Sequence, residues 1–431
     1  MSISAEKFRL ALMSHQTGDF TSAEQGYRNI LSRTPQDVTV LYHLGIVLHQ
    51  QGKMEEALLI LNNTVRYAPD FPQAHFSLGS VLSELHRGQE AETAFRNALA
   101  LEPKMQKALL RLGEQLVPQK KYTEAVSLLR QAIQLCGTDK KAWIALTGAL
   151  RGLDLYEEAV KANIQLLALD GSDNNYHVEL SHLIYMLHQQ NPELACQYLH
   201  QWIVAFPDNA LAQHVSSSIL RLPAPDRASD HYVKALFDNF AGSFEKQLSK
   251  LGYRISDMLA MISALHTPQG TLIVLDAGCG TGLAAESLRP YAKWLTGVDL
   301  SPKMLEKSRE KELYDELVEM ELGGFLQAHT NRFDLITAFD VFIYFGDLTP
   351  VLNNVFYALQ PGGKLTFSVE SSNSDHEFTL ETHGRYSHNK NYVISVILMS
   401  GLRLLEIQEK VLRYEFGNAI NALLVVADKP N

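Results

Sequence analysis

The chain has 431 residues, of which 46% are hydrophobic and 20% charged, with a formal net charge of -10. At about 150 residues per domain this length predicts two or three domains, and the apolar fraction excludes a disordered or fibrous chain. No apolar run is long enough to cross a membrane, and the acidic balance argues against binding nucleic acid. The three cysteines lie far apart and form no C-x-x-C pair, which favours a reducing, cytoplasmic location without a disulfide framework.

The first half of the sequence repeats with a period of 34 residues. Two in-phase columns are an alanine at positions 23, 57, 91, 125 and 159, and a leucine at positions 10, 44, 78, 112 and 146. This period indicates two helices per copy, with the column residues packed between them. The pattern resembles the tetratricopeptide repeat family.

A sixth, degenerate copy follows, and its column residues are Ala195, Trp202 and Pro207. A last helix over 211–222 would cover the apolar end of the array. We therefore expect an all-α solenoid over 1–222 that binds a protein or peptide on its concave face. Candidate residues for that face are Tyr42, His43, Asn63, His75 and Asn97.

A short proline-bearing stretch, 223–229, reads as a linker. The segment 230–268 is then expected to be helical, with aromatic residues at helical spacing: Tyr232, Phe237, Phe240 and Phe244. Two interpretations stay open for these aromatic residues. They form either a packing stripe or a lid over the site of the next domain.

From residue 269 the pattern becomes that of an α/β domain. An apolar run over 271–275 is expected of a buried parallel strand, and it leads into Asp276-Ala-Gly-Cys-Gly-Thr-Gly282 and a helix over 283–289. Such a turn lets backbone N–H groups approach a ligand closely. The alternating glycines differ from the G-x-G-x-x-G spacing of dinucleotide sites. The carboxylate of Asp276 would repel a pyrophosphate and favour an ammonium group.

The strands that follow end on acidic residues. A second strand, 294–298, ends at Asp299, which suits hydrogen bonding to ribose hydroxyls, and a helix then starts at Ser301-Pro302. A third strand over 317–322 carries Glu321, and a fourth over 333–339 ends at Asp340. Further strands are predicted at 364–369, 403–413 and 421–427, which gives a seven-stranded, mostly parallel, Rossmann-like sheet.

The ordered set DAGCGTG, GVDLSPKML, FDLITAFDVFIYF and LQPGGKL resembles the class I S-adenosylmethionine-dependent methyltransferases over 271–428. The resemblance implies that S-adenosyl-L-methionine is the cofactor, with Asp299 on the ribose and Glu321 and Leu322 beside the adenine. The full implied set is Asp276, Gly278, Cys279, Gly280, Gly282, Asp299, Leu300, Met304, Glu321, Leu322 and Asp340. The stretches LFDNFAGSFEKQLSKLGYR and HGRYSHNKNY further resemble a group of bacterial methyltransferases fused to tetratricopeptide repeats, which implies an architecture and no substrate.

Methyl transfer to a hydroxyl, phenol or ammonium needs a group that removes a proton. The candidates are Tyr344, Tyr386 and His388, with Arg385 as a possible anchor for an anionic substrate. No metal site is expected, because His383 and His388 have no further ligands at suitable spacing. Three hypotheses remain: a methyltransferase for a protein or peptide recruited by the repeats, a small-molecule O- or N-methyltransferase, and a non-catalytic adaptor that binds the cofactor.

Overall fold

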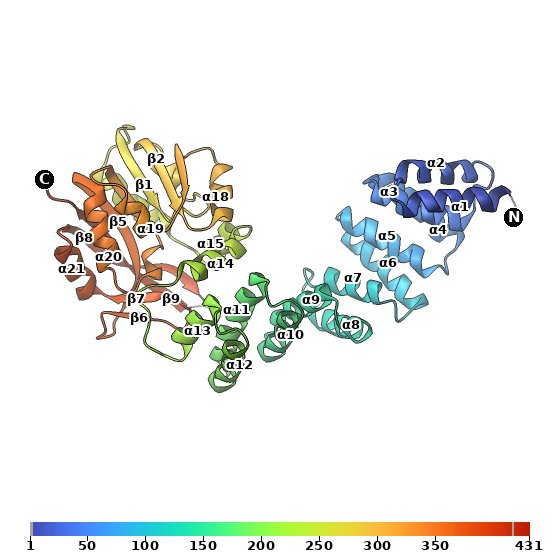
Figure 1. The fold of residues 1–431 in the computed structure, drawn as a ribbon, viewed down its shortest axis with the longest axis horizontal. Helices are drawn as coiled ribbons and strands as arrows, with labels where there is room; N and C mark the ends of the chain where they lie inside the picture. The colour runs from blue at the N-terminus through green and yellow to red at the C-terminus, as the bar shows by residue number, and fades with distance from the viewer. Residues whose placement is uncertain (1–2, 416–417) are drawn as a thin grey trace. The chain divides into compact units, whose positions relative to one another are not determined.

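The computed structural model describes residues 3–415 and 418–431, which form two compact units that divide between Ser172 and Asp173. The first unit is blue to teal in Figure 1, and the second runs from green to red. In the described part of the chain, no helix is both long and apolar enough to span a bilayer.

The first unit is built from helix pairs in which each helix packs against the next. Its helices are α1 (Ile3–Gln16), α2 (Phe20–Leu31), α3 (Val38–Gln50), α4 (Met54–Tyr67), α5 (Pro72–Glu84), α6 (Gly88–Leu101), α7 (Gln106–Leu116), α8 (Tyr122–Leu135), α9 (Lys140–Gly152) and α10 (Tyr156–Leu169). Five helix pairs in 3–172 confirm the 34-residue period as five repeats.

Packing between the helices explains the repeated columns. All five column alanines are fully buried, and so are four of the five column leucines. Leu10 is the exception, being 52% exposed, because it lies on α1 and no described helix precedes α1 to cover it. His75 is also not on an exposed face as predicted. It is buried, and its Nε2 lies 2.9 Å from the carbonyl oxygen of Pro69.

The glycine after the column leucine is required by a large apolar side chain on the second helix of the repeat. A Cβ built on Gly45 would lie 2.7 Å from the side chain of Leu61. The same relation joins Gly79 to Phe95 and Gly113 to Leu129. In the fifth repeat these two positions are Thr147 and Asn163, which are buried and have no hydrogen-bond partner for the threonine hydroxyl or the asparagine amide.

The second unit begins with the predicted sixth helix pair and terminal helix. These are α11 (Asn174–Gln190), α12 (Pro192–Ala205) and α13 (Ala210–Ile219). Both α11 and α13 pack against the next helix, α14 (Asp230–Phe240). On α13, Nε2 of His214 lies 2.8 Å from the carbonyl oxygen of Gly384. These helices are therefore part of the same compact unit as the α/β domain.

The stretch 223–229, predicted as a linker, is pinned to the α/β domain by its backbone. The N–H of Ala228 donates to the carbonyl of Tyr344 at 2.8 Å, and the carbonyl of Asp226 accepts from the N–H of Gly346 at 2.8 Å. The hydroxyl of Tyr386 donates to the carbonyl of Pro225 at 2.7 Å. These bonds remove the freedom expected of a linker.

A nine-stranded sheet forms the centre of the second unit within the described residues. Its strands are β1 (Leu272–Ala277), β2 (Ala292–Asp299), β3 (Glu316–Glu319), β4 (Phe333–Ala338), β5 (Leu359–Ser372), β6 (Phe378–Leu380), β7 (Tyr386–Asn389), β8 (Arg403–Glu415) and β9 (Asn418–Asp428). The parallel core has the order β3-β2-β1-β4-β5, and β9 pairs antiparallel with both β5 and β8.

The prediction of seven strands missed the hairpin of β6 and β7, which attaches to the end of β5. These strands are only three and four residues long, too short for a clear periodic signal.

Helices cover both faces of the sheet. One face carries α19 (Leu322–Gln327), α20 (Thr349–Ala358) and α21 (Lys390–Met399), which share the largest apolar core of this unit. The other face carries α16 (Ile255–Leu265) and α17 (Ala285–Leu288). The helix predicted over 283–289 is shorter in the structure, where α17 has four residues. The third strand ends at Glu319, before the predicted Glu321, because Glu321 caps α19 instead.

Candidate active site

The carboxyl ends of β1, β2 and β4 meet around the glycine turn. Both neighbours of β1 are parallel to it, so the three carboxyl ends lie at the same edge of the sheet. There Asp276 on β1 is in register with Gly297 on β2 and Thr337 on β4. The turn after β1 has positive φ angles at Gly278, Gly280 and Gly282, of 65°, 56° and 76°. A side chain at these positions would be strained.

Space around the turn differs from one glycine to the next. A Cβ built on Gly278 would lie 2.4 Å from Val341, just after the end of β4. A Cβ on Gly280 would meet only a ring atom of Phe244, at 3.8 Å. Gly278 is therefore needed for packing against the neighbouring strand end. Gly280 leaves room for a ligand to approach the backbone.

Asp276 is buried at the start of the turn. Its carboxylate accepts hydrogen bonds from the hydroxyls of Tyr314 at 2.6 Å and Thr337 at 3.2 Å. Burial raises the pKa of this carboxyl to about 6, although both hydrogen bonds act in the opposite direction. A cationic ligand would stabilise the ionised form of this buried carboxyl.

Asp299 connects β2 to the turn. Its two carboxylate oxygens accept the backbone N–H groups of Gly280, at 2.9 Å, and Ser301, at 2.8 Å. Burial also raises the pKa of this carboxyl to about 6. Ser301 caps α18 (Pro302–Arg309), as the Ser-Pro signal predicted. Each Asp299 oxygen keeps lone pairs with which it can accept a ligand hydroxyl.

Three residues that the sequence predicts to lie near the adenine have structural contacts of their own. Glu321 accepts the N–H groups of Gly323 and Gly324, both at 2.8 Å, and so caps α19. Met304 is fully buried in the first turn of α18, and Leu322 is buried in the core beneath the sheet. Of the remaining predicted residues, Cys279 is buried and Leu300 is half-buried beside Asp299.

The segment 230–268 folds into α14, α15 (Phe244–Lys250) and α16, and the first two are tied to the glycine turn. Glu245 accepts the hydroxyl of Thr281 at 2.8 Å and the ammonium of Lys311 at 2.7 Å. Asp238 accepts the hydroxyl of Ser301 at 2.5 Å. These bonds fix α14 and α15 beside the turn and α18, near each other in Figure 1.

Aromatic rings from this segment extend toward the end of β4. The ring of Phe237 lies 6.0 Å from that of Phe244 and 5.6 Å from that of Tyr344, edge to face in both pairs. Phe240 is half-buried on the same helix. Tyr232 does not join this group, because it is buried and stacks on His214 at 3.9 Å.

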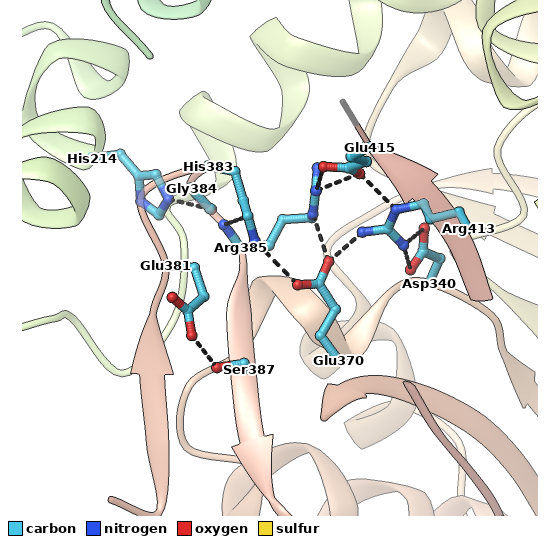
Figure 2. A network of polar contacts seen from close by, with 10 residues as sticks. All are labelled: His214, Asp340, Glu370, Glu381, His383, Gly384, Arg385, Ser387, Arg413 and Glu415. Carbon is cyan, nitrogen blue, oxygen red and sulfur yellow. Dashed lines mark hydrogen bonds and ion pairs between the residues drawn. The ribbon is translucent and has the colours of Figure 1, made fainter. Parts of the chain in front are cut away.

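A group of ion pairs lies beyond the ends of β4 and β5. We call it the ionic cluster, and its residues are Asp340, Glu370, His383, Arg385, Arg413 and Glu415. Asp340 follows β4, and Glu370 lies on β5. His383 and Arg385 lie in the turn between β6 and β7, and Arg413 and Glu415 lie on β8. Figure 2 shows their side chains converging, with both guanidinium groups directed at Glu370.

The ionic cluster is densely hydrogen-bonded. Arg413 donates to Asp340 at 2.9 and 3.1 Å, to Glu415 at 2.7 Å and to Glu370. Arg385 donates to Glu370 at 2.8 Å and to Glu415 at 2.5 and 2.6 Å. Burial alone would raise the pKa of Glu370, but Arg385 and the neighbouring cations hold that pKa far below its usual range.

The ring of Tyr344 lies beside that of Phe237, whereas His388 and Tyr386 are enclosed on β7. His388 is fully buried, its Nε2 lies 2.9 Å from the carbonyl oxygen of Phe345, and burial lowers its pKa to about 4. Tyr386 is fully buried and bonded to the backbone of the 223–229 stretch. Both side chains have packing roles in this structure, and their catalytic role stays a prediction.

Arg385 is likewise not a free anchor, because Glu370 and Glu415 already engage its guanidinium. The sequence analysis missed Glu370, Arg413 and Glu415. Two signals point to them in hindsight. Glu370 lies near the carboxyl end of strand β5. Arg413 and Glu415 are two residues apart on β8, so their side chains lie on the same face of that strand.

The strand order, the antiparallel β9 and the glycine turn define a class I methyltransferase fold. The comparisons agree with this conclusion. Residues 275–367 match the methyltransferase domain family, and residues 15–78 and 76–140 match two tetratricopeptide repeat families. The chain therefore joins tetratricopeptide repeats to a class I methyltransferase domain.

Two curated relatives are named as O-methyltransferases. A ubiquinone biosynthesis O-methyltransferase of Coxiella burnetii is 31% identical over 103 residues, which is 23% of this chain and 44% of the relative. A malonyl-(acyl-carrier protein) O-methyltransferase of Acetivibrio thermocellus is 30% identical over 149 residues, which is 33% of this chain and 50% of the relative. The chain thus spans half or less of these relatives' length.

Among solved structures, a crystal structure of MamA is 23% identical, with a TM-score of 0.37. The match covers 39% of this chain and 92% of that chain.

Proposed function

We propose that the chain is an S-adenosylmethionine-dependent methyltransferase that acts on a protein or peptide recruited by its repeats. The observation that carries the proposal is the pair of carboxylates, the buried Asp276 and the half-buried Asp299, on either side of a glycine turn whose backbone is accessible at Gly280. When bound, this cofactor supplies a methyl group on a positively charged sulfur.

The residues of the turn fit such a cofactor chemically. Asp276 is suited to an ammonium group, because its buried carboxylate has only hydroxyl partners and no cation. Asp299 is suited to ribose hydroxyls through its remaining lone pairs. Phe244 lies over Gly280, where it can exclude water from the bound ligand.

The helices α14 and α15 then act as the lid. Glu245 ties α15 to the turn through Thr281, and Asp238 ties α14 to the cap of α18. Movement of these helices away from the turn would have to break both contacts. The two contacts therefore couple access to the site with the structure of the turn. The aromatic residues of the lid would line the path of the acceptor.

Recruitment by the repeats is proposed because the first unit contains five complete repeats and none of the residues of the site. A fused array of this kind offers an extended surface for a partner. A second candidate function is methylation of a small molecule at oxygen. It is favoured by the names of the two O-methyltransferases to which the α/β region is similar.

Cofactor binding and methyl transfer test the proposal directly. Calorimetry with S-adenosylmethionine should give one site per chain, and D299A should weaken binding at least about tenfold, because it removes hydrogen bonds to a charged group. D375A, the loss of an aspartate from an exposed loop, is the matched control and should bind normally.

Incubation with methyl-labelled cofactor and a cell lysate then separates the candidates. Label in protein supports the first function, and label only in small metabolites supports the second. Cofactor binding without any transfer would leave a non-catalytic adaptor.

A further inference from the structure

Asp340 has an unusual position at the end of β4. Its backbone is in the left-handed region, with φ of 60°, and its N–H donates to the hydroxyl of Ser368 at 2.9 Å. The next residue, Val341, is the one that a Cβ on Gly278 would overlap. A non-glycine residue held in this conformation costs free energy and is found preferentially at functional sites. Asp340 therefore sits directly beside the glycine turn.

The carboxylate of Asp340 is also the least satisfied and most accessible in the ionic cluster. Glu370 and Glu415 each accept from both arginines, whereas Asp340 accepts from a single nitrogen of Arg413. The Asp340 side chain is 21% exposed, against 4% for Glu370 and 12% for Glu415. Lone pairs of Asp340 thus remain for a group that arrives from the open side.

The other candidates for taking up a proton are already engaged or cannot accept one. Nδ1 of His383 accepts the N–H of Arg385 at 3.3 Å, and its Nε2 lies 3.3 Å from Glu370, so neither ring nitrogen is free. Tyr344 stays protonated, because burial raises the pKa of its phenol well above the ordinary value. Tyr386 is fully buried with its hydroxyl bonded to Pro225, and burial lowers the pKa of the fully buried His388 to about 4, which disfavours its protonated form.

The charge of the ionic cluster restricts what can approach. It holds three carboxylates and two guanidinium groups, so its carboxylates outnumber its guanidinium groups by one. The excess is one negative charge in a largely buried place. A carboxylate acceptor would be repelled there, whereas a hydroxyl would be tolerated and an ammonium attracted.

We propose that Asp340 is the catalytic proton acceptor and that the methyl acceptor is a hydroxyl or amine, not a carboxylate. This proposal rests on the methyltransferase function proposed above. The lone pair of the acceptor atom forms the bond to the methyl carbon, and the carbon–sulfur bond breaks with its electron pair going to sulfur. The proton of the acceptor atom passes to the Asp340 carboxylate and then to solvent. Burial raises the pKa of Asp340, which improves it as a base.

The first test compares D340N with the unmodified chain in transfer of methyl label to a lysate at saturating S-adenosylmethionine. The expected loss of transfer rate is about 100-fold or more, measured at a cofactor concentration that saturates each variant according to its own dissociation constant. D340E should recover part of the rate, because it restores a carboxylate. D375N, the same chemical change on an exposed loop, should transfer normally. Normal transfer by D340N would overturn the proposal.

The second test identifies the acceptor class without identifying the acceptor. Methyl esters release methanol in mild alkali, whereas methyl ethers and methylamines do not. Label transferred by the unmodified chain should therefore survive alkali treatment. Acid hydrolysis and chromatography then distinguish the amine from the hydroxyl product. Alkali-labile label would overturn the acceptor class while leaving the methyltransferase function intact. Failure to bind or use the cofactor at all would overturn both.

A third measurement covers the case in which D340N folds poorly. The transfer rate of the unmodified chain at saturating cofactor should fall as pH is lowered through the pKa of Asp340. The charged or titratable groups that face this carboxyl are Arg385, Arg413, Glu370, Glu415, Tyr253 and Tyr344, and burial keeps the phenol of Tyr344 protonated. Four of these groups keep their charge in the weakly acidic range: both arginines stay protonated, Glu370 stays ionised, and the buried Tyr253 stays neutral. Burial would raise the pKa of Glu415, but its contacts with both arginines outweigh burial and hold that pKa below the ordinary value. A rate that does not change with pH would contradict the proposal.

Discussion

At the scale of single residues, burial rather than pairing governs the carboxylates around the glycine turn. Asp276 and Asp299 have only hydroxyl and backbone N–H partners, and burial raises the pKa of each to about 6. In the folded protein they therefore bind protons that the unfolded chain has already released. Without a ligand, their contribution to stability falls as pH rises from about 4 to about 6.

A cationic cofactor reverses this preference, because it interacts favourably with the ionised carboxylates. We expect the affinity for S-adenosylmethionine to increase at least about tenfold from about pH 5 to about pH 7, since ionising these carboxyls favours the bound state. Calorimetry across this range measures the change. D276N should reduce the slope, and an affinity independent of pH would mean that neither carboxylate contacts the cofactor.

At the scale of elements, three of the repeats place a large apolar residue of the second helix opposite a glycine of the first. Gly113 and Leu129 are such a pair, and Thr147 and Asn163 replace it in the fifth repeat. The two polar side chains fill the same space but leave buried groups without hydrogen bonds. Unsatisfied buried groups of this kind cost about 1–3 kcal/mol each.

This substitution can be tested with a double-mutant cycle. N163L alone should destabilise α9 and α10 by about 1–3 kcal/mol, because leucine would be overpacked against Thr147. T147G alone should cost about 1 kcal/mol in helix propensity. T147G with N163L restores the pair found in the preceding repeats, so the double variant should be more stable than the two single effects predict, with a coupling of about 1–2 kcal/mol.

Amide hydrogen exchange in peptides from α9 and α10 measures each corner of the cycle. Q165L, a change at an exposed position of α10, should simply add to the effect of T147G. A coupling near zero for the first pair would contradict the packing argument.

At the scale of the whole molecule, the compact units do not divide at the stretch that looked like a linker. His214 on α13 contacts Gly384, the residue between His383 and Arg385 of the ionic cluster. Its ring also stacks on Tyr232 of α14. The last helices of the repeat-like region therefore support the turn that carries part of the site.

Two truncations test this arrangement. A fragment of residues 173–431 should bind the cofactor like the full chain, because it keeps the whole second unit. A fragment of residues 223–431 should melt at least about 5 °C lower, because it loses the contacts of α11 and α13. Equal melting temperatures for the two fragments would contradict the structural role of these helices.

The longer fragment also examines the role of the repeats in recruitment. It should lose methyl transfer to proteins in a lysate while keeping its cofactor affinity. Full transfer by residues 173–431 would instead favour the small-molecule function.

The sequence by itself determined the elements that rest on local periodicity. The 34-residue period established five helix pairs, because every copy must bury the same columns. The apolar runs and the acidic residues that end them located β1, β2 and β4, and with them Asp276, Asp299 and Asp340. These features depend on neighbours along the chain or on the general geometry of parallel strands, so sequence analysis could find them.

Only the tertiary structure decided which polar residues share a site. Arg413 and Glu415 lie more than forty residues beyond Glu370 in the chain, yet β9 places β8 where the side chain of Arg413 reaches Glu370. The same folding encloses His388 and Tyr386, which looked catalytic because of their residue types alone. Burial and charge pairing are sums over groups distant in sequence, so no local pattern specifies them.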